Sequence, residues 1–127
     1  MEYLIDSNVI SDFLTNSLNI KATEFVSEIL DTNPIISFIT QIELLSWKAN
    51  TKIEKDIASF VDGCEVKGIS QDIINHCVKL RRVNKLKTPD AIIAGTALSF
   101  GYKIVTNNTK DFTNIKGLKI INPYDLL

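Results

Sequence analysis

The chain has 127 residues, of which 45% are hydrophobic and 23% are charged, and its formal net charge is −1. This length and apolar content predict one globular domain over residues 1–127 and exclude a disordered tail. The near-neutral charge excludes a protein that holds nucleic acid by bulk positive charge alone.

The N-terminal residues and the cysteines indicate where the protein works. The N-terminus has no basic segment followed by a long apolar run, so we expect neither a secretory signal nor a membrane span. Cys64 and Cys77 have no Cys or His neighbour at ligand spacing and are interpreted as reduced thiols. These features predict a cytoplasmic protein.

The first half of the chain alternates short apolar runs with segments of helical periodicity. The apolar runs are rich in β-branched and aromatic residues, which is typical of buried strands. Gly63 is a helix stop signal. Strands are predicted at residues 3–6 and 35–38, and helices at residues 9–15, 21–31, 40–49 and 52–61.

The second half repeats this alternation. Ser70 is the expected N-cap of a helix, and Thr88 is the expected N-cap of another helix with Pro89 in its first position. Strands are predicted at residues 65–67, 103–106 and 118–121, and helices at residues 70–83 and 88–100. Strands separated by helices predict an α/β fold whose mostly parallel central sheet has about four to five strands.

Three carboxylates stand among apolar residues. Asp6 ends the first strand, Glu43 lies on a helix that is apolar nearly all round, and Asp90 lies in a first helical turn. A lone carboxylate in such a setting tends to take up a proton, whereas several that converge can stay ionised around Mg²⁺ or Mn²⁺. Ligands of parallel sheets bind beyond the carboxyl ends of the strands, where Asp6, Asn108 and Asp111 all follow strands. The pattern predicts a metal-dependent phosphodiesterase.

Each acid also has a structural interpretation. Asp6 could cap the helix that follows, Glu43 could form a structural salt bridge, and Asp90 is favoured by the helix dipole. Asp111 alone would be an ordinary loop acid. His76 is the only histidine, and we interpret it as structural.

A basic run leads into Asp90. Arg81, Arg82, Lys85 and Lys87 follow Lys79 with no acid between them. Such runs are usually solvated faces, and the position beside Asp90 raises the alternative of a track for a phosphate backbone.

The ordered set of motifs resembles a PIN-domain ribonuclease, most closely the VapC-type toxins of toxin–antitoxin pairs. The resemblance covers nearly the whole chain. It rests on the segments Leu4-Ile5-Asp6-Ser7-Asn8, Glu43 on a helix, Pro89-Asp90-Ala91, and Thr106-Asn107-Asn108 with Asp111-Phe112.

The resemblance implies endonucleolytic cleavage of RNA with Mg²⁺ or Mn²⁺. Asp6, Glu43 and Asp90 match the three core acids, which would bind the metal, and Asp111 is a fourth catalytic candidate. Many members have Asp where Asn108 stands, so the resemblance leaves open whether Asn108 or Asp111 completes the site. The positions that match supporting polar residues are Ser7, Asn8, Thr106 and Asn108.

The resemblance also implies partners. We expect an RNA substrate, a cognate antitoxin that places a basic side chain among the acids, and a homodimer without membrane contact. The helix that carries Phe25, Ile29 and Leu30 could supply the dimer interface or belong to the core.

Two other function classes compete with the nuclease. A PIN-like domain that binds RNA or protein without cutting would explain the amide of Asn108. A phosphotransfer domain also begins with Asp after a first strand, but Asn8 stands where dehalogenase-like enzymes need a second Asp.

Overall fold

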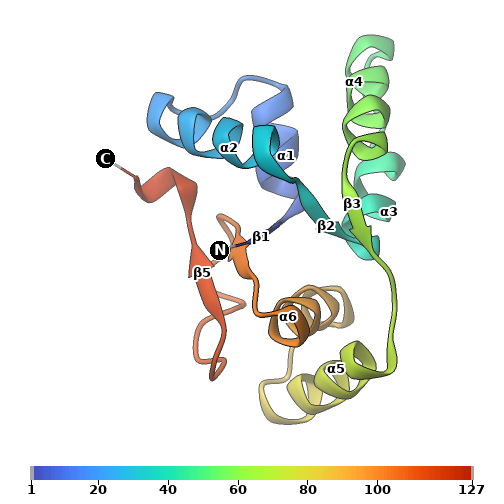
Figure 1. Cartoon of the computed structure of the whole chain (residues 1–127), viewed down its shortest axis with the longest axis vertical. Coiled ribbons are helices and arrows are strands. Elements are labelled where there is room, and N and C mark those ends of the chain that lie inside the picture. The colour runs from blue at the N-terminus through green and yellow to red at the C-terminus, as the bar shows by residue number, and fades with distance from the viewer. Residues whose placement is uncertain (1, 127) are drawn as a thin grey trace.

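The computed structural model describes residues 2–126 and contains one parallel sheet of five strands in the order β3-β2-β1-β4-β5 (Figure 1). All four strand pairs are parallel. The strands are β1 (Tyr3–Ile5), β2 (Ile35–Ser37), β3 (Glu65–Lys67), β4 (Lys103–Val105) and β5 (Lys119–Ile121). The α/β prediction and the expected strand number are therefore confirmed.

Alternating side chains give the sheet two apolar faces. Neighbouring residues of a strand point to opposite faces, so a fully apolar strand must be buried on both sides. Leu4, Ile35 and Ile104 join one core cluster. Their neighbours Ile5, Ile36 and Val105 join the other.

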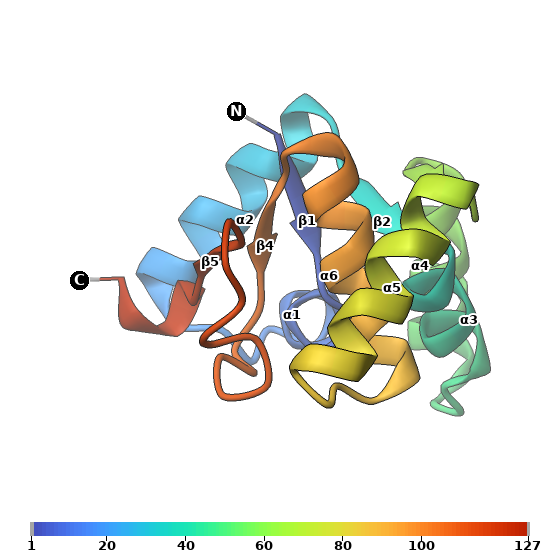
Figure 2. The same ribbon diagram turned by 90° about the horizontal axis from the view of Figure 1, so that it is seen from below.

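Six α-helices of the described residues cover these faces. Helices α5 and α6 pack on the side of Leu4, whereas α1 to α4 supply the core on the other side (Figures 1 and 2). The helices are α1 (Ser7–Leu14), α2 (Ile20–Thr32), α3 (Phe38–Ser46), α4 (Thr51–Asp62), α5 (Gln71–Val83) and α6 (Thr88–Phe100), and a short 3₁₀ helix, η1 (Pro123–Asp125), follows β5. None of the helices in this part of the chain is long and apolar enough to cross a lipid bilayer.

The largest error of the sequence prediction concerns α3, which was expected at residues 40–49 but runs from Phe38 to Ser46. Helix α3 begins at Phe38, which we assigned to a strand, because Ser37 ends β2 and caps α3 through Ile39 N–H. Thr88 was the expected N-cap of α6 but is its first residue, and Lys87 takes the cap position without a side-chain hydrogen bond. Ser70 caps α5 as predicted, accepting from Ile73 N–H.

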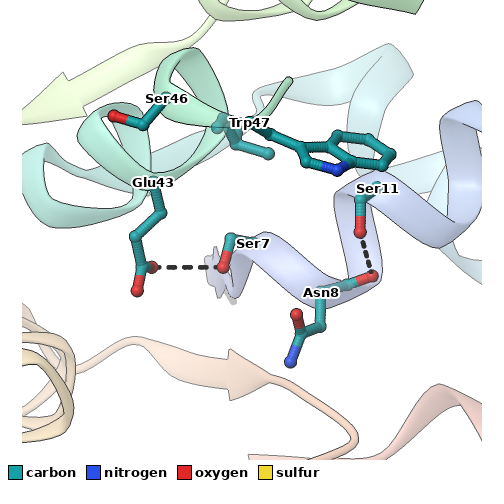
Figure 3. A pocket seen from close by; sticks show the side chains of 7 residues that line it. Ser7, Asn8, Ser11, Glu43, Ser46 and Trp47 are labelled. Carbon is teal, nitrogen blue, oxygen red and sulfur yellow. Dashed lines mark hydrogen bonds between the residues drawn. The ribbon is translucent and has the colours of Figure 1, made fainter. Parts of the chain in front are cut away.

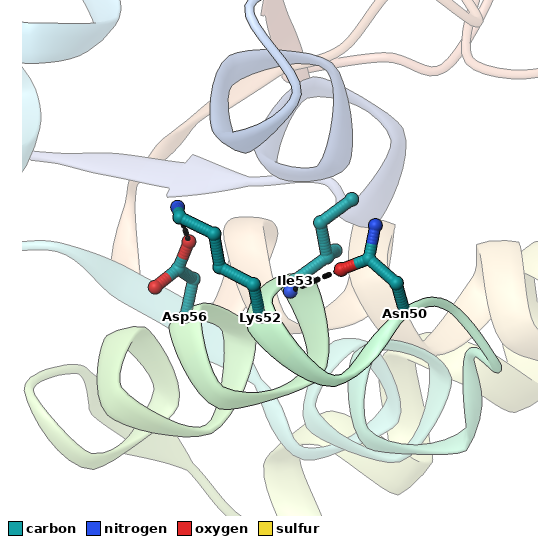
Figure 4. Close-up of polar contacts among 4 residues, drawn as sticks. All are labelled: Asn50, Lys52, Ile53 and Asp56. Carbon is teal, nitrogen blue, oxygen red and sulfur yellow. Dashed lines mark hydrogen bonds and ion pairs between the residues drawn. The ribbon is translucent and has the colours of Figure 1, made fainter.

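Helix α4 shows how local sequence fixes a start that we misplaced by one residue. The Asn50 side chain accepts a hydrogen bond of 2.9 Å from the backbone N–H of Ile53, and Lys52 and Asp56 form an ion pair of 3.1 Å one turn apart (Figure 4). An amide N-cap contributes about 1 kcal/mol, whereas an exposed ion pair one turn apart contributes a few tenths.

The helix that we considered for a dimer interface lies in the core. Ile29 is 7% exposed, and Phe25 and Leu30 are partly buried against the same cluster. The Phe25 ring also packs edge-on against Tyr3, with ring centroids 5.6 Å apart. The core interpretation of this helix is therefore the right one.

Gly95 lets α5 and α6 approach closely. A Cβ at this position would lie 3.0 Å from Cys77 Sγ and 3.3 Å from both His76 Cβ and the backbone oxygen of Ile73. The thiol of Cys77 also donates to the backbone oxygen of Ala91 at 3.1 Å, so it is fixed between the helices.

We expect Gly95→Ala to lower the free energy of unfolding by about 1–3 kcal/mol, because the added methyl group overpacks this contact. Urea denaturation followed by circular dichroism measures the change. Gly68→Ala is the matched control, since nothing lies within 4 Å of its added Cβ. An equal loss in both variants would contradict the packing explanation.

Candidate active site

The sheet has its switch point between β1 and β4. From β1 the chain builds the sheet outward through β2 and β3, and it returns to the other side of β1 with β4 and β5. The crevice of such a sheet opens beyond the carboxyl ends of the two central strands. Asp6 follows β1 there, and Thr106 follows β4.

Asp6 is held rigidly at this edge. It is 7% exposed and serves as the N-cap of α1. One carboxylate oxygen accepts from Ser7 N–H at 2.8 Å, and the other accepts from Thr106 Oγ1 at 2.7 Å. Burial raises the pKa of Asp6, and these two hydrogen bonds oppose that rise. Asp6 thus has the capping role of its structural interpretation, and its orientation is fixed within the crevice.

Glu43 reaches the same crevice from α3. Ser7 Oγ donates to Glu43 Oε1 at 3.1 Å (Figure 3). Desolvation by burial raises the pKa of Glu43, the hydrogen bond from Ser7 lowers it, and the nearby Asp6 charge raises it. No salt bridge to Glu43 forms within residues 2–126. The salt-bridge interpretation of this residue therefore fails.

Asp90 lies in the first turn of α6, and its pKa is shifted further than those of Asp6 and Glu43. Burial raises the pKa of Asp90 to about 6, with further increases from the charges of Asp111 and Asp6 and a smaller decrease from Lys87. A helix dipole alone would lower the pKa of an acid in a first turn. Desolvation and the like charges of Asp111 and Asp6 set the direction of the shift at this site.

Asn108 and Asp111 form one unit in the loop after β4. The Asn108 side chain donates to Asp111 Oδ2 at 2.9 Å, and its backbone N–H donates to Thr106 Oγ1 at 3.0 Å. Thr106 in turn donates to Asp6. The loop is thus joined to Asp6 by a continuous set of hydrogen bonds.

The carboxylates therefore influence one another along a row. Glu43 responds to Asp6, and Asp90 responds to both Asp6 and Asp111. As the side chains stand, no three His, Cys, Asp or Glu groups of residues 2–126 are placed to hold a metal ion together. The donor chemistry still fits a hard divalent cation, because its charge would stabilise acids whose pKa values are raised by burial and by one another.

A basic pocket of about 390 Å³ adjoins the Asp90 end of this row. Its charged lining consists of Lys85, Lys87 and Lys110 together with Asp90 and Asp111. Lys85 and Lys87 belong to the basic run that we considered as an RNA track, whereas Arg81 and Arg82 lie exposed in the last turn of α5 and do not line this pocket.

Lys110 and Trp47 lie near the site but were not predicted from the sequence as site residues. Lys110 lies outside the basic run before Asp90, and its proximity to Lys85 depends on folding, because 25 residues separate the two in sequence. Trp47 follows a helix that was expected to be apolar on all sides, yet Ile42 and Leu45 of that helix are 54% and 53% exposed. Asn8, a predicted supporting residue, lies with Trp47 in a pocket beside Glu43.

Comparison with known proteins relates this geometry to a family. The family model of the PIN domain matches residues 3–118. Ribonuclease VapC1 of Rickettsia felis is 43% identical over 49 residues, a segment that covers 39% of this chain and 35% of that relative's length.

Solved structures match over nearly the full length. A toxin–antitoxin complex from Klebsiella pneumoniae has a chain with a TM-score of 0.80 and 31% identity, covering 98% of this chain and 100% of that one. A chain of VapBC-1 from nontypeable Haemophilus influenzae has a TM-score of 0.79 and 26% identity, and the match covers 97% of this chain and 98% of that one. On this fold and on the match over residues 3–118, the chain belongs to the PIN domain family.

Proposed function

We propose that the chain is a metal-dependent endoribonuclease and the toxin of a toxin–antitoxin pair. The observation that carries the proposal is the row of Glu43, Asp6, Asp90 and Asp111 at the switch point of the sheet. The name of the Rickettsia relative and the toxin–antitoxin complexes among the similar structures support it. In this proposal the protein acts on RNA in the cytoplasm.

In this proposal Asp6, Glu43 and Asp90 hold a Mg²⁺ or Mn²⁺ ion. Such an ion lowers the pKa of a bound water and neutralises charge on the phosphoryl oxygens. Asp6 is the most rigid of the three acids, because both of its oxygens accept hydrogen bonds from fixed neighbours. Ser7 positions Glu43, and Thr106 positions Asp6.

Asp111 completes the site in this proposal, and Asn108 orients it. The side-chain amide of Asn108 donates a hydrogen bond to Asp111 and so holds this otherwise exposed carboxylate toward the row. Asp111 then accepts a proton from a water molecule beside the scissile phosphate. The departure of this chain from the acid found at position 108 in many relatives is therefore compensated three residues later.

The basic pocket binds RNA phosphates next to the cut. Lys85 and Lys87 reach it from the loop between α5 and α6, and Lys110 reaches it from the loop after β4. Arg81 and Arg82 would extend this track along α5. Lysine contacts to phosphate release counterions and make binding dependent on salt.

We expect the double change Lys85→Ala and Lys87→Ala to weaken RNA binding and to reduce the slope of log K against log salt concentration by about 1–2. Fluorescence anisotropy of a labelled single-stranded RNA, measured in EDTA between low and moderate salt, gives both quantities. Lys21→Ala with Lys119→Ala is the control pair, because these exposed lysines lie on α2 and β5 and do not line the pocket. Equal slopes in both pairs would refute a phosphate site here.

An antitoxin partner follows from the same proposal. An arginine or lysine side chain placed among these carboxylates would stabilise their negative charges, as the resemblance implies. Such a side chain would occupy the position of the metal and inhibit cleavage. A homodimer remains a prediction, and the side of α2 that carries Ile29 is buried in the core of this chain.

A second candidate function is RNA binding without cleavage. Asn108 supports it, because an amide stands where many relatives have a fourth carboxylate, and the acids as they stand do not form a ready ion site. Chelator separates the two functions: a binding module keeps its RNA affinity in EDTA and never cuts, whereas the proposed nuclease cuts RNA only with divalent metal.

A further inference from the structure

A second pocket adjoins the opposite end of the acid row, at Glu43. It has a volume of about 390 Å³ and lies between α1 and α3 (Figure 3). Ser7 and Glu43, which belong to the candidate active site, form one part of its lining. The remaining lining residues, Asn8, Ser11, Leu44, Ser46 and Trp47, are contributed by the two helices and the end of α3.

The pocket combines an aromatic face with hydrogen-bonding groups. Trp47 is 39% exposed, which is high for the largest apolar side chain, and its backbone N–H is bonded to Leu44 O at the end of α3. Leu44 is 2% exposed and supplies an apolar floor. Ser11 Oγ donates to Asn8 O, so this hydroxyl keeps its acceptor capacity, and the Asn8 side chain extends away from its helix (Figure 3).

The charges of the two pockets separate their ligands. Glu43 is the one ionisable group in the lining of the Trp47 pocket, so a phosphate would be repelled there. The basic pocket at the other end of the row is lined by three lysines, Lys85, Lys87 and Lys110, against two carboxylates, Asp90 and Asp111. A planar, uncharged ligand with polar edges fits the Trp47 pocket, and a nucleobase has this chemistry.

We propose that the Trp47 pocket binds an unpaired RNA base next to the cleaved bond. Trp47 stacks on the base, and Asn8 and Ser11 offer hydrogen bonds to its edge. When the scissile phosphate of an RNA strand lies at the acid row, a base on one side of that phosphate reaches the pocket at Glu43. The phosphates on the other side of the cleaved bond then reach the basic pocket at Lys85. The pocket therefore gives the enzyme a base preference at one position, and this inference rests on the proposed RNA substrate.

The chain offers a direct probe, since Trp47 is its only tryptophan. We would titrate the protein in EDTA with a short single-stranded RNA, and with a series of the same RNA lacking one base at successive positions. Binding is followed by anisotropy of a labelled RNA and stacking by tryptophan emission. We expect the intact RNA to quench the emission, and one abasic RNA of the series to bind about tenfold more weakly without quenching.

Two variants locate the effect. We expect Trp47→Ala to raise the dissociation constant of the intact RNA about tenfold. Its affinity for the abasic RNA should be no lower than that of the wild type, because the stacked base is already absent. The RNA affinity of Trp47→Phe should stay close to that of the wild type. Leu45→Ala is the control for an exposed apolar residue of the same helix, because Leu45 does not line this pocket.

Unchanged emission at saturating RNA, no RNA binding, or equal affinities of Trp47→Ala and wild type would overturn the base pocket. A protein that binds RNA with full dependence on Trp47 but cuts none in Mg²⁺ or Mn²⁺ would instead overturn the proposed nuclease and leave the base pocket standing. Loss of inhibition by a partner protein in Trp47→Ala, with RNA affinity unchanged, would assign the pocket to that partner and refute the base.

Discussion

The Asp6→Asn protein is expected to cleave RNA more slowly than the wild type by a factor on the order of 10³. The amide keeps the size of the side chain and can still accept the hydrogen bond from Ser7 N–H. It removes the negative charge at the centre of the acid row, where Glu43 and Asp90 both respond to it. The loss is therefore one of charge rather than of shape.

Single-turnover cleavage of a labelled RNA in Mn²⁺ measures this effect. Asp12→Asn is a matched control: Asp12 lies on the same helix and bonds to Tyr124, not to the acid row. Both variants must show the far-ultraviolet spectrum of the wild type. An Asp6→Asn protein that cuts at the wild-type rate would remove Asp6 from the catalytic site.

The Asp90→Asn protein is expected to lose cleavage and to gain thermal stability when metal is absent. The pKa of Asp90 is raised from 3.8 to about 6 in the folded protein. The folded state then binds the proton more tightly than the unfolded state, so stability falls as pH rises from about 4 to 6 and the full cost is present at pH 7. Removing the charge relieves this cost.

The gain should be modest. Asp90 is partly exposed, so solvent screening leaves about 1 kcal/mol, and the lost interaction with the helix dipole offsets part of it. We expect the melting temperature at pH 7 to rise by about 2–4 °C over the wild type in EDTA. At pH 4.5, where Asp90 is mostly protonated in the folded wild type, the difference should nearly vanish.

With bound metal, the wild type should have a higher melting temperature than Asp90→Asn. Millimolar Mg²⁺ or Mn²⁺ should raise the melting temperature of the wild type, since an ion that binds only the folded state stabilises it, and should leave Asp90→Asn almost unchanged. Scanning calorimetry in EDTA and in metal checks both signs. A variant that is less stable than the wild type in EDTA at pH 7 would show that Asp90 has a mainly structural role.

The central strands could be predicted from the sequence because their signal is local. Each of these strands contains a buried apolar pair, Leu4–Ile5, Ile35–Ile36 and Ile104–Val105, and burial on both faces of the sheet requires that composition. The convergence of Asp6 and the loop of Asp111 followed from the rule that parallel strands share a carboxyl edge. The candidate acids at this edge could therefore be predicted from the sequence alone.

Features that depend on tertiary contacts could not be predicted from the sequence. Phe38 has strand propensity, but Ser37 ends β2 and caps α3, so the chain turns one residue early. The periodicity of Phe25 and Ile29 is the same for a core and for a dimer surface, and only packing against Tyr3 separates them. The meeting of Lys110 with Lys85 and the open face of Trp47 depend on how distant segments are arranged.

The metal dependence of cleavage shows whether the acid row works through a divalent ion. Purified wild-type protein, free of any partner, would be incubated with a mixed pool of tRNA and rRNA in Mg²⁺, in Mn²⁺ and in EDTA, and cut sites mapped from the new ends. We predict discrete cleavage in metal, none in EDTA, and recovery when excess metal is returned. Cleavage at the same sites and rate in EDTA would show that the acid row does not act through a divalent ion.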